Sequence, residues 1–211
     1  MSSLAIDHLV VTANTLENGV AYVQQKLGVT MQPGGKHVRM GTHNALLRLS
    51  ERIYLEVIAA DPTASAPDRP RWFQLDELHP ESTPRLATWV VRTTDIRTTV
   101  SALNPSPGGI ETMTRGDLNW QITIPQDGRL VCDGVMPSLI EWERGSHPAE
   151  FLTDCGVTLK QLTAHHSRAA DVLEQLERAG FQGIFSVLPS SQTFETFLAA
   201  EFQTPSGTRT L

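Results

Sequence analysis

The chain lacks the features that mark several classes of protein. It has only two cysteines in 211 residues, Cys132 and Cys155, and they show neither the close spacing of a zinc site nor the dense pattern of a disulfide-rich secreted domain. It has no basic surplus either, since 17 Lys and Arg residues stand against 23 Asp and Glu residues and give a net charge of -6. Such a chain cannot replace the counterions along phosphates, so we expect no nucleic-acid partner and no binding to an anionic membrane.

Signals for export and for membrane insertion are also lacking. The N-terminus has no basic region followed by an apolar core, and no apolar run is long enough to span a bilayer. Together with free thiols, this predicts a cytoplasmic protein. The hydrophobic fraction of 40% and the charged fraction of 19% are typical of a globular chain that buries a real core.

The first part of the chain predicts a strand, a helix and three more strands. Residues 5–12 form a β-rich run, and Thr15 is a suitable N-cap for a helix with one apolar stripe. Gly34 and Gly35 break the chain before the later strands. Those strands are expected near residues 37–40, 44–49 and 53–59. This pattern makes one βαβββ module over residues 4–61.

The same order of elements then repeats. Residues 62–84 contain several prolines and no periodicity, so they indicate a linker. A second βαβββ module follows over residues 85–145, and a partial third unit, βαββ, over residues 155–211. The strands of the second module are expected near residues 86–93, 111–114, 120–124 and 138–143. The sequence therefore predicts a single α+β domain over residues 1–211, built from repeated modules.

An alignment of the two modules places chemically useful residues at matching positions. His8 in the first strand of one module lies opposite Thr88 in the other, and Glu56 in the last strand lies opposite Glu141. A glutamate in the middle of an apolar strand is costly to bury unless its charge is compensated. Imidazole nitrogen with carboxylate oxygens suits a divalent ion such as Zn, Mn, Fe, Ni or Co, which these residues do not distinguish.

Several stretches of the sequence resemble the glyoxalase-like family of the vicinal-oxygen-chelate superfamily. They are IDHLVV, GGKHVRMGTHNALLRL followed by YLEVI, LIEWERGSHP and TPSGTRTL, and together they cover most of the chain. The resemblance implies that the paired modules form a cup-shaped half-barrel of mixed β-sheet. It also implies a ligand site inside the cup, where members that bind metal hold the ion with a His from a first strand and a Glu from a last strand.

Carried onto this chain, the resemblance implies a metal site made by His8, Glu56 and Glu141. Thr88 departs from the pattern, because a second histidine or another strong ligand is usual there, and His37 is a potential substitute. The ion would act as a Lewis acid that stabilises an enediolate, with Glu141 as the catalytic base.

Four further residues are predicted to contact a substrate. Arg39 and Arg48 alternate with apolar neighbours on their strands, so either can neutralise an anionic substrate. His37 follows two glycines and is either a ligand or an edge residue. Asn44 follows a Gly-Thr turn, and it either contacts the substrate or fixes that turn by hydrogen bonding.

Each candidate ligand also has a purely structural interpretation. His8 can be a hydrogen-bonded core histidine, and Glu56 can form a cross-strand ion pair with Arg48 or Arg52. Glu141 has Arg144 nearby. The His147-Pro148 and His165-His166 pairs are interpreted as structural, and the strand tryptophans as core residues.

Two functions follow from these patterns. The first is a divalent-metal-dependent enzyme, a lyase, an isomerase or a dioxygenase, that acts on a small oxygenated molecule. The alternative is a metal-free protein of the same fold that binds a small molecule or a drug. A structural or partner-binding protein is a weaker third interpretation. Paired modules of this kind often dimerise through exposed sheet edges, so a homodimer is also expected.

Overall fold

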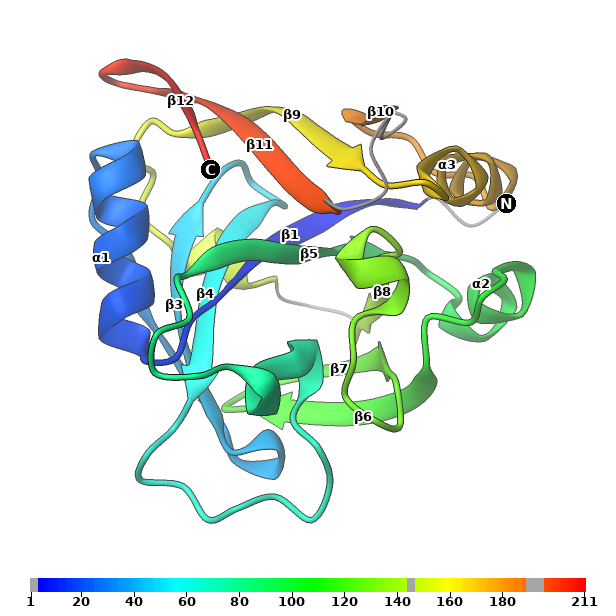
Figure 1. Cartoon of the computed structure of the whole chain (residues 1–211), viewed down its shortest axis with the longest axis horizontal. Coiled ribbons are helices and arrows are strands. Elements are labelled where there is room, and N and C mark those ends of the chain that lie inside the picture. The colour runs from blue at the N-terminus through cyan, green and yellow to red at the C-terminus, as the bar shows by residue number, and fades with distance from the viewer. Residues whose placement is uncertain (1–3, 144–146, 189–195) are drawn as a thin grey trace.

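Two βαβββ modules share one eight-stranded sheet, as the computed structural model shows for residues 4–143, 147–188 and 196–211 (Figure 1). The first module consists of β1 (Ala5–Thr12), α1 (Leu16–Leu27), β2 (Gln32–His37), β3 (Thr42–Arg48) and β4 (Tyr54–Ala60). The second consists of β5 (Arg85–Arg92), α2 (Ile96–Ala102), β6 (Gly109–Arg115), β7 (Leu118–Ile124) and β8 (Ser138–Trp142). The prediction of paired βαβββ modules in an α+β fold is confirmed.

The sheet is a mixed one with matching halves. Its strand order is β2-β3-β4-β1-β5-β8-β7-β6, so each module contributes its strands in the same order outward from the centre. The first strand of each module runs parallel to the last, and β1 and β5 meet antiparallel at the centre. The edge strands β2 and β6 also contact each other, because the sheet curls into a half-barrel.

Short-range signals set both ends of α1 and the start of α2. The Thr15 side chain accepts a hydrogen bond from the Asn18 amide at 3.2 Å, and Gly28 ends α1 in the left-handed conformation with a φ of 72°. In the second module, Asp95 accepts from the Thr98 amide at 3.0 Å. These are the N-cap and C-cap interactions that satisfy the free backbone groups of a helix.

One strand of the first module is displaced from its predicted position. The strand expected at residues 37–40 is β2, which begins at Gln32, whereas Val38–Met40 form a turn of 3-10 helix, η1. Gly34 and Gly35 lie inside β2 and do not end it. The pairing of β2 with β3 shifts register between Pro33 and Lys36, so an irregular strand accommodates the two glycines.

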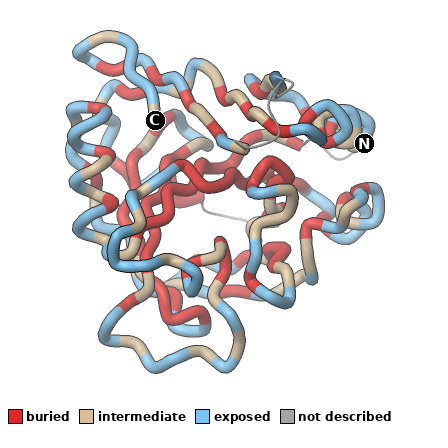
Figure 2. Tube along the Cα trace, viewed as in Figure 1, coloured by how far each residue is buried: buried red, intermediate tan, exposed pale blue. Residues whose placement is uncertain are grey.

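The two faces of the sheet bury different clusters, and its central strands β1 and β5 are buried along most of their length (Figure 2). The convex face carries the helices, and Leu9, Val57 and Trp89 belong to its core. The concave face carries apolar side chains such as Val10 and Ile58, and it is covered by a segment that lies inside the cup.

That segment comes from the stretch predicted to be a linker. Within residues 62–84, Trp72–Glu77 form a 3-10 helix, η2, and Trp72, Phe73 and Leu75 are buried against the concave face. Phe73 and Gln74 adopt left-handed φ angles of 55° and 60°, which are costly for residues other than glycine. The stretch is therefore a part of the core as well as a connection.

The C-terminal unit forms a second sheet that lies over β5 (Figure 1). It consists of β9 (Thr158–His165), α3 (Ala169–Arg178), β10 (Phe185–Leu188), β11 (Phe197–Thr204) and β12 (Gly207–Thr210). Its order is β10-β9-β11-β12, and β9 pairs parallel with the strand directly after the helix. The two modules instead pair their first strand with their last, so this unit is an extension with its own topology.

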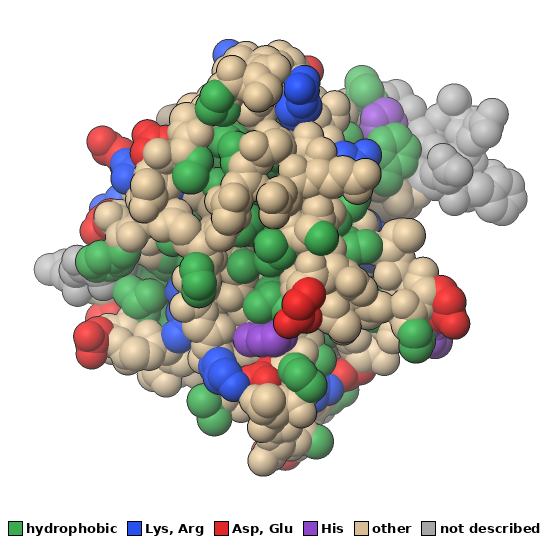
Figure 3. All heavy atoms as spheres, turned by 90° about the vertical axis from the view of Figure 1, so that its left-hand side faces the viewer, with side chains coloured by type: hydrophobic (Ala, Val, Ile, Leu, Met, Phe, Trp, Pro, Cys, Tyr) green, Lys and Arg blue, Asp and Glu red, His purple; other side chains and the backbone are tan. Residues whose placement is uncertain are grey.

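Two short 3-10 helices complete the described structure, η3 (Val131–Gly134) and η4 (Pro148–Phe151). None of the helices in the described ranges is both long and apolar enough to cross a membrane. On the face that carries α1, acidic and basic side chains are scattered among uncharged ones (Figure 3).

Candidate functional site

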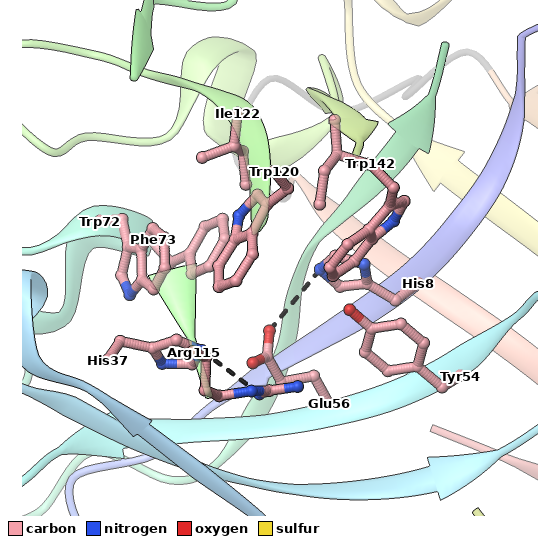
Figure 4. Close-up of a pocket in the computed structure, with 11 residues that line it drawn as sticks. His8, His37, Tyr54, Glu56, Trp72, Phe73, Arg115, Trp120, Ile122 and Trp142 are labelled. Carbon is pink, nitrogen blue, oxygen red and sulfur yellow. Dashed lines mark hydrogen bonds and ion pairs between the residues drawn. The ribbon is translucent and has the colours of Figure 1, made fainter. Parts of the chain in front are cut away.

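A small pocket lies inside the cup between side chains of both modules, and the space in it that water-sized molecules can reach is about 20 Å³ (Figure 4). We name it the His8 pocket. The first module lines it with polar side chains: His8, His37, Tyr54 and Glu56. The second module lines it with one cation and an apolar wall: Arg115, Trp120, Ile122, Ile140 and Trp142. Trp72 and Phe73 of the buried segment complete the lining.

An irregularity in β1 sends two neighbouring side chains to the same region. The pairing of β1 with β5 skips Asp7, since Ile6 lies opposite Val91 and His8 opposite Val90. Adjacent residues of a regular strand point to opposite faces, and a bulge of this kind redirects one of them. Asp7 and His8 are therefore in contact, with 2.7 Å between the Asp7 Oδ1 and the His8 Nδ1.

Asp7 is a fully buried carboxylate surrounded by hydrogen-bond donors. Its Oδ2 accepts from the Trp142 Nε1 at 2.9 Å and lies 3.1 Å from the His147 Nε2. Burial alone raises the pKa of Asp7, but hydrogen bonds from His147 and His8 and the charge of both rings hold the pKa of this carboxyl group well below its ordinary value. Asp7 is therefore ionised at neutral pH.

The same contacts fix the protons on the two histidines. The Ala149 amide donates to the Nδ1 of His147 at 3.3 Å, so the proton of a neutral His147 is on Nε2, where it is donated to Asp7. His8 uses Nδ1 to donate to Asp7 and therefore directs Nε2 into the pocket. A carboxylate that orients an imidazole in this way leaves the other ring nitrogen free for proton transfer.

Glu56 lies directly opposite that nitrogen. Its Oε2 is 3.6 Å from the His8 Nε2, a separation slightly longer than a hydrogen bond. Its other oxygen accepts a hydrogen bond from the Asn44 Nδ2 at 2.5 Å, and the Asn44 Oδ1 accepts from the Gly35 amide at 2.8 Å. These bonds hold the carboxylate of Glu56 in place.

Two more residues of the first module surround this pair. The Tyr54 ring stacks on the His8 ring with 4.5 Å between centroids, and its hydroxyl points into the pocket (Figure 4). Burial and the carboxylates of Asp7 and Glu56 raise the pKa of Tyr54 well above its ordinary value, although Arg115 lowers it in part. Tyr54 is therefore a protonated phenol that can donate a hydrogen bond.

His37 is a neutral histidine in the pocket wall. Burial, followed by the charge of Arg115 and of the neighbouring His8 and His43, lowers the pKa of His37 to about 3. Its Nε2 lies 3.4 Å from an Arg115 guanidinium nitrogen, and its Nδ1 lies 3.2 Å from the Thr42 hydroxyl. Since an arginine can only donate, Nε2 is the acceptor and Nδ1 carries the proton.

The structure brings together only some of the residues predicted to form the site. His8, Glu56 and His37 line the His8 pocket, and Asn44 lies behind Glu56. Glu141 is not in the pocket, because its neighbours Ile140 and Trp142 occupy the concave face of β8.

The Glu141 carboxylate lies on the convex side, where its Oε2 accepts a hydrogen bond from the Ile96 amide at the start of α2, at 2.8 Å. Its predicted roles as ligand and base do not fit this position. Arg39 and Arg48 are likewise outside the pocket: Arg39 forms an ion pair with Glu111, and Arg48 donates to the Leu152 carbonyl.

The donor set does not fit the metal ion that the resemblance implies. In the described ranges, no group of three or more His, Cys, Asp or Glu residues converges in a way that could hold an ion. His8 and Glu56 supply two ligands, whereas structural and catalytic sites use at least three protein ligands as a rule. Thr88 adds none, because it does not line the His8 pocket, and its hydroxyl donates to the Gly134 carbonyl at 3.0 Å.

The buried segment also keeps Thr88 apart from His8. A second cavity lies on the side of the second module and includes Thr88 in its lining, and Trp72 and Phe73 line both cavities. The two aromatic side chains therefore divide the cup, and donors from the two modules do not meet around one point.

Sequence reasoning missed Asp7, Tyr54 and Arg115. Asp7 stands directly before His8 in the chain, and Tyr54 stands two residues before Glu56, where strand alternation gives both side chains the same face. A charged residue within an apolar strand was the only signal that could have identified Asp7. Arg115 is the last residue of the edge strand β6, directly before a hairpin turn, where a charged side chain is ordinary.

Comparisons with known proteins agree with this architecture. A family model described as "Glyoxalase-like domain" matches residues 6–180. No curated protein sequence matches the chain. A hypothetical protein from Staphylococcus aureus has the same fold over 92% of this chain and 88% of its own, with 12% identity and a TM-score of 0.62.

Two methylmalonyl-CoA epimerases also match over part of the chain. A variant of the Streptomyces coelicolor enzyme in complex with 2-nitronate-propionyl-CoA is 15% identical and has a TM-score of 0.44 over 68% of this chain and 97% of its own. The Mycobacterium tuberculosis enzyme is 14% identical and has a TM-score of 0.38 over 67% of this chain and 88% of its own.

Proposed function

We propose that this chain, which belongs to the glyoxalase-like domain family of the vicinal-oxygen-chelate superfamily, is an enzyme that moves a proton at a carbon next to a carbonyl group of a small molecule. The observation that carries this proposal is the contact chain Asp7–His8–Glu56. It directs an imidazole nitrogen and a carboxylate oxygen, 3.6 Å apart, into a pocket with an apolar opposite wall.

Three neighbouring polar groups, Glu56 and His8 in the pocket and Asp7 behind His8, each have a role in such a reaction. The Glu56 carboxylate takes the proton from the carbon, and the protonated His8 donates its Nε2 proton to the carbonyl oxygen, which gives an enol. Asp7 orients the imidazole and stabilises its positive charge. Where that carbon carries a hydroxyl group, the enol is an enediol; Glu56 returns its proton to the former carbonyl carbon while the hydroxyl loses its proton to His8, which completes an isomerisation. Where the next carbon carries a leaving group, its loss, with return of the enol proton to His8, completes a lyase reaction.

The apolar wall strengthens this arrangement. Trp120, Ile122, Ile140 and Trp142 exclude water from one side of the pocket, and charges attract each other more strongly in a medium of lower polarity. His8 and Glu56 are only 3% and 5% exposed, so water screens their interaction weakly. A general acid and a general base held in this way contribute about 10²–10⁴-fold to a rate.

The metal-dependent lyase, isomerase or dioxygenase remains a more demanding alternative, because an ion would need at least one ligand besides His8 and Glu56. Proton transfer by the two side chains needs no such addition. A metal-free binding protein is favoured by a different observation, namely the five aromatic side chains that line the pocket: Tyr54, Trp72, Phe73, Trp120 and Trp142.

Exchange of carbon-bound hydrogen for solvent deuterium tests the enzymatic proposal. A panel of small hydroxyketones, 2-oxo acids and aldehydes is incubated with chelator-treated protein in D2O and followed by proton NMR. We expect exchange in at least one compound, and we expect Glu56→Gln and His8→Gln to slow it by about 10²-fold or more. The matched control is Glu141→Gln, which removes a carboxylate of the convex face and should leave the rate unchanged.

Exchange that persists in Glu56→Gln would contradict the proposal. Binding of aromatic compounds without any exchange, equal in the wild type and in Glu56→Gln, would favour the binding protein. Exchange that disappears with chelation and returns with one added divalent ion would favour the metal-dependent enzyme.

A further inference from the structure

We propose that Arg115 is the residue that selects the substrate of this pocket, and that the substrate is a small monocarboxylate. The inference rests on the proposed function for the chemistry, but the binding step is tested separately below.

The other cations near the pocket entrance are neutralised by carboxylates. The Lys36 ammonium lies 2.8 Å from Asp61, and Arg39 lies 2.5 Å from Glu111, which also pairs with Arg69. Arg115 is different: none of the described carboxylates lies within ion-pair distance of its guanidinium. Its polar contact is with the neutral ring of His37.

The fold holds this unpaired guanidinium in position. Arg115 ends β6, and the curled sheet brings that edge strand against β2 of the other module. A Cβ at Gly35 would lie 2.8 Å from the Arg115 Cδ, so the side chain crosses the edge of the sheet at a point where only glycine leaves room. The His37 Nε2, held as an acceptor, fixes the direction of one N–H group.

Arg115 also lies where a substrate would pass. An outer groove, lined by residues 36–39, residues 112–116 and Trp120, shares His37, Arg115 and Trp120 with the His8 pocket. The guanidinium therefore stands at the junction of an open groove and the enclosed pair of His8 and Glu56. In Figure 4 it lies on the same side of the pocket as His37 and Glu56.

The charges of the site favour a carboxylate over a phosphate. A planar guanidinium forms two parallel hydrogen bonds with either group. The carboxylate of Glu56 lines the pocket and that of Asp7 lies behind His8, and a phosphate would bring about 1.5–2 further negative charges against one unpaired arginine. A carboxylate brings one charge, which Arg115 balances.

The test uses the full chain with isotope-labelled arginine. The NMR signal of the Arg115 side chain, assigned by its loss in Arg115→Gln, is followed during titration with acetate, pyruvate and lactate. Methyl pyruvate and inorganic phosphate serve as the uncharged and the more highly charged probes. We expect saturable shifts with at least one carboxylate, and weaker binding of the ester and of phosphate.

Two variants separate the charge from its position. Arg115→Gln should weaken carboxylate binding about 10–100-fold, because hydrogen bonds to charged groups are lost. Gly35→Ala keeps the arginine but displaces it, so it should also weaken binding. Lys36→Gln is the matched control, since it removes an already paired cation of the same groove, and binding should stay within about twofold.

Absence of binding by every carboxylate, unchanged affinity in Arg115→Gln, or tighter binding of phosphate would each overturn the inference. Failure of the proposed function gives a different result: carboxylates would still bind through Arg115, while deuterium exchange would be absent or independent of Glu56.

Discussion

The buried, neutral His37 gives the protein a specific dependence of stability on pH. The pKa of this histidine is 6.5 ordinarily and about 3 in the folded protein, so between these values the unfolded chain binds a proton that the folded protein does not. The contribution of His37 to the free energy of unfolding is therefore complete above this window and is lost as the pH falls through it. Between about pH 7 and pH 4, the loss from this group amounts to about 3 kcal/mol.

The assay is urea unfolding of the wild type and of His37→Gln at a series of pH values. Glutamine does not titrate, and its side-chain oxygen can accept from Arg115 as Nε2 does. The free-energy difference between the two proteins should therefore shift by about 3 kcal/mol across the window, in favour of the variant at acid pH. A parallel dependence on pH in both proteins would refute the assignment of His37 as a buried neutral group.

Two further predictions concern the polar network. Asp7→Asn places an amide next to Nδ1 of His8, so the imidazole loses its orientation. The rate of deuterium exchange should therefore fall about 10²-fold or more, while the far-UV circular dichroism spectrum stays unchanged. Retained exchange would show that Asp7 is only structural. Gly34→Ala introduces a Cβ only 2.0 Å from the Asn44 Oδ1 and 3.0 Å from its backbone oxygen. We expect the free energy of unfolding in urea to fall by about 1–3 kcal/mol, because the added methyl group overpacks this site. Deuterium exchange of the substrate should also be slower, because the displaced Asn44 no longer holds the Glu56 carboxylate. A variant as stable as the wild type would contradict this packing.

The fold follows from the sequence because its signals are local and repeated. Alternation of apolar residues, the caps at Thr15 and Asp95, and the recurrence of one element order specify two βαβββ modules. Each module buries a convex face of ordinary aliphatic residues against its helix. These features depend on hydrogen bonding and burial within a module, and therefore they can be recognised without knowledge of distant contacts.

The site follows from the sequence only in part, because one residue of register decides which side chains enter the cup. His8 and Glu56 both lie on the concave face, as the alignment of the modules predicts. The alignment also equates Glu56 with Glu141, but β8 presents Ile140 and Trp142 to the pocket. A shift of one residue moves every side chain of a strand to the opposite face, and sequence patterns locate strand ends less accurately than that.

Other parts of the site depend on contacts that local sequence patterns do not predict. The bulge that redirects Asp7 arises from the pairing of β1 with β5, which come from different modules. The buried segment around Trp72 and Phe73 has the composition of a loop, with prolines and no periodicity, yet its aromatic residues fill the cup. Neither feature has a local signature, because each depends on a partner remote in the chain.

The two modules are equivalent in fold but not in chemistry, and this asymmetry explains the departure from a metal site. Backbone pairing and the convex core maintain the architecture, so the concave residues of one module can change without loss of the fold. In the second module, the residues on the concave face include Trp120, Ile140 and Trp142, which line the pocket opposite the polar residues of the first module. A metal held between modules needs donors from both. An acid–base pair instead gains from a dry wall on one side, because the attraction between His8, Glu56 and a polarised substrate increases as water is excluded.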